Sequence, residues 1–327
     1  MVSLDTLSEV ITGCVQFEVS GVGSRLEAPQ LTDLRGSQWI SVTGGAQVTL
    51  PSLRRFVQGS GNWYWLHVEG AGSVLNLPVL DLLQASLDSV THIQVYGGGQ
   101  LKLGALKELV TGTLVMDVSG EGTKFELPQL TEIRGRQALG VSGGAQVTLP
   151  ALHRFVQGAT SGWYWLSVDG EGSSIACPTL ELLEGNLQDT TILLVRNGGR
   201  LIFDTLHEIV TGGVQVSVEG PESRFEAPQL TDLRDRPSFT ASAGAQVVLP
   251  SLRRFAQGGA TGWTWLTANG VGSLIDLPAM ESVEGNAATG QATAIQAYNA
   301  GRVRLQNLPR IVVGNIQVLS DGIGSLV

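Results

Sequence analysis

The chain has 327 residues, of which 43% are hydrophobic and 15% charged, with 43 glycines and a formal net charge of −9. This composition is too apolar for a disordered protein, and the acidity with only three lysines excludes a general nucleic-acid binder. No run of about 20 apolar residues occurs, so we expect no membrane insertion.

The N-terminal stretch VSLDTLSEVITG at 2–13 lacks the basic start and the apolar run of a signal peptide. Its pattern returns as LKLGALKELVTG at 101–112 and LIFDTLHEIVTG at 201–212. We therefore expect residues 1–13 to form only the tail of a repeating unit.

A longer motif shows the repeat clearly. GGAQVTLPSLRRF at 44–56 returns as GGAQVTLPALHRF at 143–155 and as AGAQVVLPSLRRF at 243–255. These spacings of 99 and 100 residues divide the chain into block 1 (14–112), block 2 (113–212) and block 3 (213–315), followed by a partial unit at 316–327. We predict one solenoid over 1–327.

Prolines mark a shorter period inside each block. Nine of the twelve follow a strand-like run, namely Pro29, Pro51, Pro78, Pro128, Pro150, Pro178, Pro228, Pro250 and Pro278. The gaps in this series are filled by Asp5, Gly104, Asp204 and Gln306. The thirteen marks give about 25 residues per coil and four coils per block.

One coil is seen in ISVTGGAQVTLP at 40–51. Alternating apolar residues predict a half-buried strand, the paired glycines a sharp corner, and the proline the end of a second short strand. Because one coil cannot bury its own apolar stripe, equivalent strands must stack in parallel. The sequence predicts an all-β, parallel β-helix-like solenoid of about 13 coils. A leucine-rich-repeat-like hybrid is the alternative, because LSEVITG, LKELVTG and LHEIVTG could each form a short helical turn.

The rhythm I-x-V-x-G…V-x-L-P-x-L-x-x-L, as in ISVTGGAQVTLPSLRRF, resembles receptor L-domain-like and fungal cell-wall (Ecm33-type) solenoids, which are relatives of leucine-rich repeats. The resemblance runs along the whole chain. It implies an extracellular or cell-surface setting.

The repeat stops in mid-pattern at both ends, where no polar capping unit is evident. This predicts either a segment of a longer repetitive protein or a subunit that joins end to end into a filament. At about 4.8 Å per coil the rod would be on the order of 60 Å long. Cys14 and Cys177 would then lie about 29 Å apart, too far for a disulfide, and we expect each to be a small buried side chain.

Tryptophan pairs recur at block spacing in GNWYWLHVEG at 61–70, SGWYWLSVDG at 161–170 and TGWTWLTANG at 261–270. Strand alternation predicts that the indoles share the polar outer face with His67, Glu69 and the equivalent residues of the other blocks. They could bind a repetitive polysaccharide or a neighbouring rod, or they could form a local core under the segment that precedes them. The candidate contact residues are Trp63, Trp65, Trp163, Trp165, Trp263 and Trp265.

Carboxylates also recur, as Glu27, Glu126 and Glu226 and then as Asp33, Glu132 and Asp232. Acidic pairs could indicate glycoside hydrolysis or calcium binding, but three equivalent copies argue against a single active site. We expect Glu27 and its equivalents to face solvent. Arg35, Arg134 and Arg234 follow closely enough to form surface ion pairs.

The histidines His67, His92, His153 and His207 show no ligand spacing, and we expect them to be solvated. No nucleophile elbow or P-loop occurs, so we predict no catalytic residue, no metal and no cofactor. The leading hypothesis is a non-enzymatic structural or adhesive repeat protein from a surface, extracellular or filament-forming assembly. Its partners would be its own copies, end to end or side by side. A carbohydrate-binding solenoid and a polysaccharide-active β-helix enzyme are the alternatives.

Overall fold

The structure is a computed structural model that describes residues 1–59, 66–110, 112–157, 164–186, 190–209, 211–258, 264–285 and 292–327. These residues form strands and turns without a helix, so none of them belongs to a helix that could span a membrane. Contacts divide the chain into unit 1, Met1–Leu152 with Gly172–Cys177, and unit 2, His153–Glu171 with Pro178–Val327.

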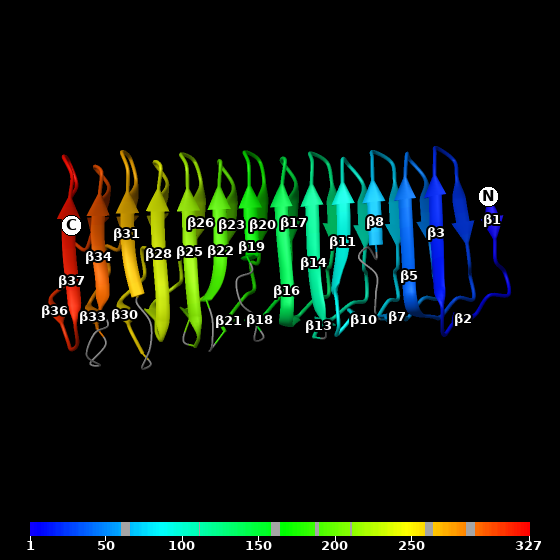
Figure 1. Cartoon of the computed structure of the whole chain (residues 1–327), viewed down its shortest axis with the longest axis horizontal. Coiled ribbons are helices and arrows are strands. Elements are labelled where there is room, and N and C mark those ends of the chain that lie inside the picture. Colours follow the sequence, from blue (N-terminus) through cyan, green and yellow to red (C-terminus); the bar gives the residue numbers. More distant parts are fainter. Residues whose placement is uncertain are drawn as a thin grey trace. The chain divides into compact units, whose positions relative to one another are not determined.

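The fold prediction is confirmed, because the strands stack in parallel as a β-solenoid of about 12 turns. Within each unit, successive turns contribute to three parallel sheets. We call them the broad sheet, the proline sheet, whose strands precede the proline marks, and the third sheet. Figure 1 shows β3, β5, β8, β11 and β14 of unit 1 as neighbouring arrows that point the same way.

The three sheets of unit 1 contain the following strands. The broad sheet contains β3 (Cys14–Ser20), β5 (Asp33–Thr43), β8 (Leu66–Glu69), β11 (Val90–Tyr96), β14 (Thr113–Ser119) and β16 (Glu132–Ser142). The proline sheet contains β1 (Val2–Ser3), β4 (Arg25–Glu27), β6 (Gln47–Thr49), β9 (Val74–Asn76), β12 (Gln100–Lys102) and β15 (Lys124–Glu126). Pairing is interrupted after β15, and β17 (Gln146–Thr148) and β20 (Ser174–Ala176) then pair with each other on the same side of the coil. The third sheet contains the first residues of β5 and β16 with β2 (Glu9–Val10), β7 (Arg55–Gln58), β10 (Leu82–Gln84) and β13 (Glu108–Leu109).

Unit 2 repeats this arrangement. Its broad sheet contains β19 (Tyr164–Asp169), β22 (Thr190–Arg196), β25 (Gly213–Glu219), β28 (Arg236–Ser242), β31 (Thr264–Asn269), β34 (Thr293–Tyr298) and β37 (Ile316–Asp321). Its proline sheet contains β23 (Arg200–Ile202), β26 (Arg224–Glu226), β29 (Gln246–Val248), β32 (Leu274–Asp276) and β35 (Arg302–Arg304). Its third sheet contains β18 (Arg154–Gln157), β21 (Leu182–Glu184), β24 (Glu208–Ile209), β27 (Asp232–Leu233), β30 (Arg254–Ala256), β33 (Ser282–Glu284) and β36 (Arg310–Ile311).

The core consists of columns of apolar side chains that point into the coil. In unit 1, Val42 pairs in register with Val68, and Val68 with Val95, so that one valine lies directly above another. All three are fully buried, and along β11 buried residues alternate with half-exposed ones. Burying such side chains removes apolar surface from water at every turn, which is the main term that stabilises the stack.

The corners form as the motif predicts. Gly44 and Gly45 have φ values of 61° and 85°, a left-handed conformation that glycine adopts without steric strain. After β6, the amide of Leu53 donates a hydrogen bond of 3.3 Å to the carbonyl of Leu50 across the turn that contains Pro51. The proline therefore lies where the strand has already ended.

The alternative of a helical turn in LSEVITG, LKELVTG and LHEIVTG is wrong. These segments contain β2, β13 and β24, and Glu9 on β2 pairs with Asp33 on β5. Stacking explains the difference, because a strand here continues the third sheet from turn to turn, whereas one helical turn would leave the neighbouring backbone groups unpaired.

Candidate functional site

The tryptophan prediction can be examined at two positions, because Trp63, Trp65, Trp163 and Trp263 lie outside the described residues. Trp165 is only 1% exposed, and its ring centroid lies 4.0 Å from that of Phe155 in an edge-on contact. Trp265 is half-buried on β31, and its Nε1 donates a hydrogen bond of 3.1 Å to Thr240 Oγ1. The outward position predicted for Trp165 is therefore wrong.

A β-bulge explains why Trp165 turns inward. On β19, Tyr164 pairs with Ile192 and Leu166 pairs with Leu193, so Trp165 is the extra residue between two consecutive pairs. The bulge interrupts the alternation of side chains, and Trp165 and Leu166 are both buried. In β31 the register is continuous, and Trp265 keeps its place between two buried neighbours.

The first set of repeated carboxylates faces outward from the proline sheet, as predicted. Glu27 is exposed, while Glu126 and Glu226 are half-exposed. Glu126 Oε1 lies 3.9 Å from Lys102 Nζ, and Glu226 Oε1 lies 2.6 Å from Arg200 Nη2, in each case across neighbouring strands. These carboxylates balance cations on the surface.

The second set forms the predicted ion pairs along the third sheet. Arg35 Nε donates to Asp33 Oδ1 at 2.9 Å, and Arg35 Nη2 donates to Asp33 Oδ2 at 2.5 Å. Hydrogen bonding from Arg35 lowers the pKa of Asp33 and outweighs the opposing effect of burial. Arg134 pairs with Glu132 in the same way.

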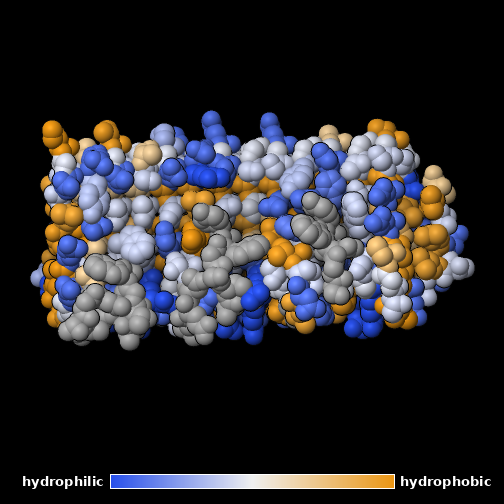
Figure 2. Space-filling model, in the orientation of Figure 1, coloured by the Kyte–Doolittle hydropathy of each residue, from blue (hydrophilic) through white to orange (hydrophobic). Residues whose placement is uncertain are grey.

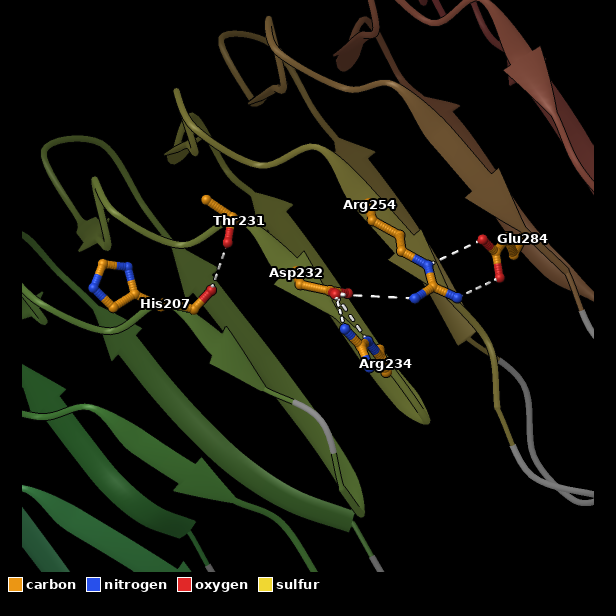
Figure 3. A network of polar contacts seen from close by, with 6 residues as sticks. All are labelled: His207, Thr231, Asp232, Arg234, Arg254 and Glu284. Carbon is orange, nitrogen blue, oxygen red and sulfur yellow. Dashed lines mark hydrogen bonds and ion pairs between the residues drawn. The ribbon is translucent and has the colours of Figure 1, made fainter.

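Unit 2 extends this pattern into the network drawn in Figure 3. Arg234 Nε donates to Asp232 Oδ2 at 2.8 Å, and Arg254 bridges from Asp232 to Glu284, with a hydrogen bond of 2.7 Å from its Nη2 to Glu284 Oε2. Opposite charges thus compensate one another from turn to turn. The network holds the carboxylates as counter-ions, which is unlike the arrangement of a hydrolase, where one acid must be free to donate a proton.

Two of the four histidines lie on one face, which the sequence analysis missed. His67 on β8 and His92 on β11 both project from the outer face of the broad sheet of unit 1, and their side chains are only 19% and 29% exposed. The available signal was the spacing, since His67, His92 and Asp117 follow one another at 25 residues, the mean coil length. His153 and His207 lie at equivalent positions of the coil in unit 2, each directly before a strand of the third sheet.

The histidines belong to a cluster spread over three adjacent strands. His67 on β8 pairs in register with Gln94 on β11, and Gln94 pairs with Asp117 on β14. Two residues further along the strands, Glu69 pairs with Tyr96. His67 Nε2 lies 3.3 Å from Glu69 Oε2, and the His67 and Tyr96 rings meet edge-on at 6.0 Å. We call His67, Glu69, His92, Tyr96 and Asp117 the histidine face.

Asp117 is the most perturbed member of the histidine face. Its Oδ2 lies 3.9 Å from His92 Nδ1, and its side chain is 40% exposed. Desolvation raises the pKa of Asp117, and the nearby His92 only partly opposes this effect. A carboxylate held without a close guanidinium or ammonium group contrasts with the ion pairs of the third sheet.

The histidine face spans block 1 and the first strand of block 2, and it is not repeated one block later. The equivalent positions there are Ser167, Asp169, Ile192, Arg196 and Ser217. The inward residues between them are equivalent, with Val95 in block 1 and Val195 in block 2 both fully buried. The repeat thus preserves the core while the outer face changes its chemistry.

A shallow cleft of about 410 Å³ opens in unit 1 where β15 and β17 lie side by side without pairing. Its lining includes Lys124, Glu126, Gln146 and Thr148 but neither histidine nor cysteine. The cleft lies where the pairing of the proline sheet is interrupted.

The cysteines differ in their surroundings. Cys177 is buried, as predicted, and burial raises the pKa of its thiol to about 12, whereas Cys14 is exposed, against the prediction. They form no disulfide with each other. Across the described ranges, no group of three or more His, Cys, Asp or Glu side chains is placed to hold a metal ion.

Comparison of the chain with protein families, with curated proteins and with solved structures found no match in any of the three. The proposals below therefore depend on the geometry of the chain itself.

Proposed function

We propose that this chain is a non-enzymatic structural and adhesive repeat protein of a surface or extracellular assembly. Its solenoid turns would hold contact surfaces at fixed spacing, and copies would associate end to end or side by side. The resemblance of its coil rhythm to that of cell-surface solenoids supports this setting.

The observation that carries the proposal is the contrast between inward and outward residues at equivalent positions. Val95, Val195 and Ala297 all fill the core of the fourth turn of their blocks and are fully buried. Beside them, the outward residues are Tyr96, Arg196 and Tyr298. A scaffold needs a constant core, while contact with different partners needs varied surfaces.

Figure 2 supports this view of the surface. Hydrophilic residues in blue lie beside hydrophobic residues in orange on the face that carries the broad sheet. In the third sheet and the proline sheet, by contrast, carboxylates such as Asp33, Glu226 and Glu284 are already paired with arginines of the same chain. The broad sheet is therefore the face best suited to contact other molecules.

We test the self-association by sedimentation velocity over about a hundredfold range of protein concentration, with negative-stain electron microscopy of the same samples. The proposal predicts a sedimentation coefficient that rises with concentration and images of joined particles. A single species at every concentration, with isolated particles throughout, would contradict self-association.

A further inference from the structure

The carboxylates of the histidine face have unusual partners. On the other faces of the coil, outward carboxylates lie beside arginines, as in Glu184 with Arg154 at 3.3 Å and Asp276 with Arg304 at 3.2 Å. Glu69 and Asp117 lie beside histidines instead. An imidazole can gain or lose a proton and its charge, whereas a guanidinium keeps its positive charge.

Few other charged groups face the cluster. On the broad sheet of unit 1, Glu18 projects outward from β3, in the row that leads through Ser41 to His67. On β16, Asp117 pairs with Gly140, and Arg136 lies four residues before Gly140, which is about 13 Å along the strand. Cys14 is the first residue of β3, which lies two strands away from β8 in the broad sheet. With neutral imidazoles, the described face therefore carries three carboxylates and one distant guanidinium.

Unit 2 shows what a guanidinium does at the equivalent position. Asp169 occupies the place of Glu69, and Arg196 occupies the place of Tyr96 on the next strand. Arg196 Nε donates to Asp169 Oδ2 at 2.9 Å, and its Nη2 lies 2.8 Å from the same oxygen. In block 1 the carboxylate is retained, but the residue beside it is an aromatic ring.

We propose that the histidine face binds an arginine-bearing basic segment of a partner protein, and that protonation of His67 and His92 weakens this binding. The partner's guanidinium takes the place beside Glu69 that Arg196 takes beside Asp169. A carboxylate supplies charge-assisted hydrogen bonds, and the Tyr96 ring supplies a surface on which a guanidinium can stack. Asp117, across Gln94 on the next strand, adds a second negative charge.

The direction of the pH effect follows from these charges. Protonation of His67 and His92 would add up to two positive charges directly beside Glu69 and Asp117, so each carboxylate would gain a counter-ion within the chain. The partner's arginine then competes with an internal cation, and its affinity falls.

The test uses the full chain and a fluorescein-labelled nonaarginine peptide, with fluorescence anisotropy at about pH 7.5 and about pH 5.5 in about 0.1 M salt. The wild-type chain should bind about tenfold more tightly at the higher pH. The double variant Glu69→Gln with Asp117→Asn should lose about tenfold in affinity at the higher pH, because both carboxylates are removed. Far-UV circular dichroism checks that the fold is kept.

The matched control is the double variant Glu121→Gln with Glu171→Gln, which removes the same charge from two exposed turns outside the face. Its affinity should change by less than about threefold, because long-range charge alone acts weakly in salt. The variant His67→Gln with His92→Gln should lose most of the difference in affinity between the two pH values, and the raised pKa of Asp117 accounts for any small remainder.

Three results would overturn the inference: no binding by the wild-type chain, an equal loss in the control, or a pH effect that is undiminished after removal of both histidines. The inference deepens the proposed contact function by naming a partner class for one surface. Its failure would leave the sedimentation result unaffected, so the two proposals can fail separately.

Discussion

Replacing Trp165 with alanine should lower the free energy of unfolding by about 3–5 kcal/mol, as for other large aromatic side chains removed from a core. The indole is fully buried against Phe155, and a cavity would remain at the bulge of β19. Urea denaturation followed by far-UV circular dichroism measures this change. Because repeat proteins can unfold in stages, the transition midpoint and its slope are both compared with the wild type.

The equivalent change in block 3, Trp265→Ala, is the matched control. Its indole is half-buried and loses one hydrogen bond to Thr240, so the expected cost is only about 1 kcal/mol. Equal losses in the two variants would contradict the inward position of Trp165 and restore the prediction of an outward tryptophan.

The second large effect is expected at Gly112. A Cβ atom there would lie 2.4 Å from the carbonyl oxygen of Ala85 on the preceding turn, and its φ of +75° is itself unfavourable for alanine. Gly112→Ala should therefore destabilise the solenoid by more than about 3 kcal/mol, because the neighbouring backbone must move to remove the clash. Thermal and urea denaturation measure the change.

Gly122 separates the effect of the steric clash from the effect of the left-handed backbone conformation. It has nearly the same φ, +76°, but a Cβ atom added there would meet nothing within 4 Å. Gly122→Ala should cost only about 1–2 kcal/mol, which is the penalty for a left-handed conformation. Equal free energies of unfolding for the two variants would contradict the close stacking of successive turns at Gly112.

The solenoid could be predicted from the sequence because each of its rules is local. Alternation in ISVTG gives a strand with one buried face, the positive φ values of Gly44 and Gly45 form the corner, and Pro51 follows the end of a strand. Repetition of these signals at coil spacing then leaves stacking as the way to bury the apolar face.

The orientation of Trp165 could not be predicted, because a bulge is a property of the pairing between strands. WYWL in block 2 and WTWL in block 3 have the same alternation, yet β19 contains the bulge and β31 does not. Similarly, LKELVTG carries a helix-like spacing, and the pairing of Glu108 with Glu132 overrides it.

The histidine face was missed because turns differ in length. His67 pairs with Gln94, 27 residues later, and Gln94 pairs with Asp117, 23 residues later. Only this register shows that His67 and Asp117 share a row and that His92 lies one step away. Without it, four histidines dispersed along the sequence resemble solvated side chains.

We propose that the repeated core is a scaffold and that its outward residues determine what it binds. This is tested by transferring the histidine face to the equivalent positions one block later, with Ser167→His, Ile192→His, Arg196→Tyr and Ser217→Asp, and by measuring the stoichiometry of nonaarginine binding by titration calorimetry. Asp169 already supplies the carboxylate equivalent to Glu69. We expect about one tight site per wild-type chain and about two per variant chain. A folded variant that still binds one peptide per chain would contradict it.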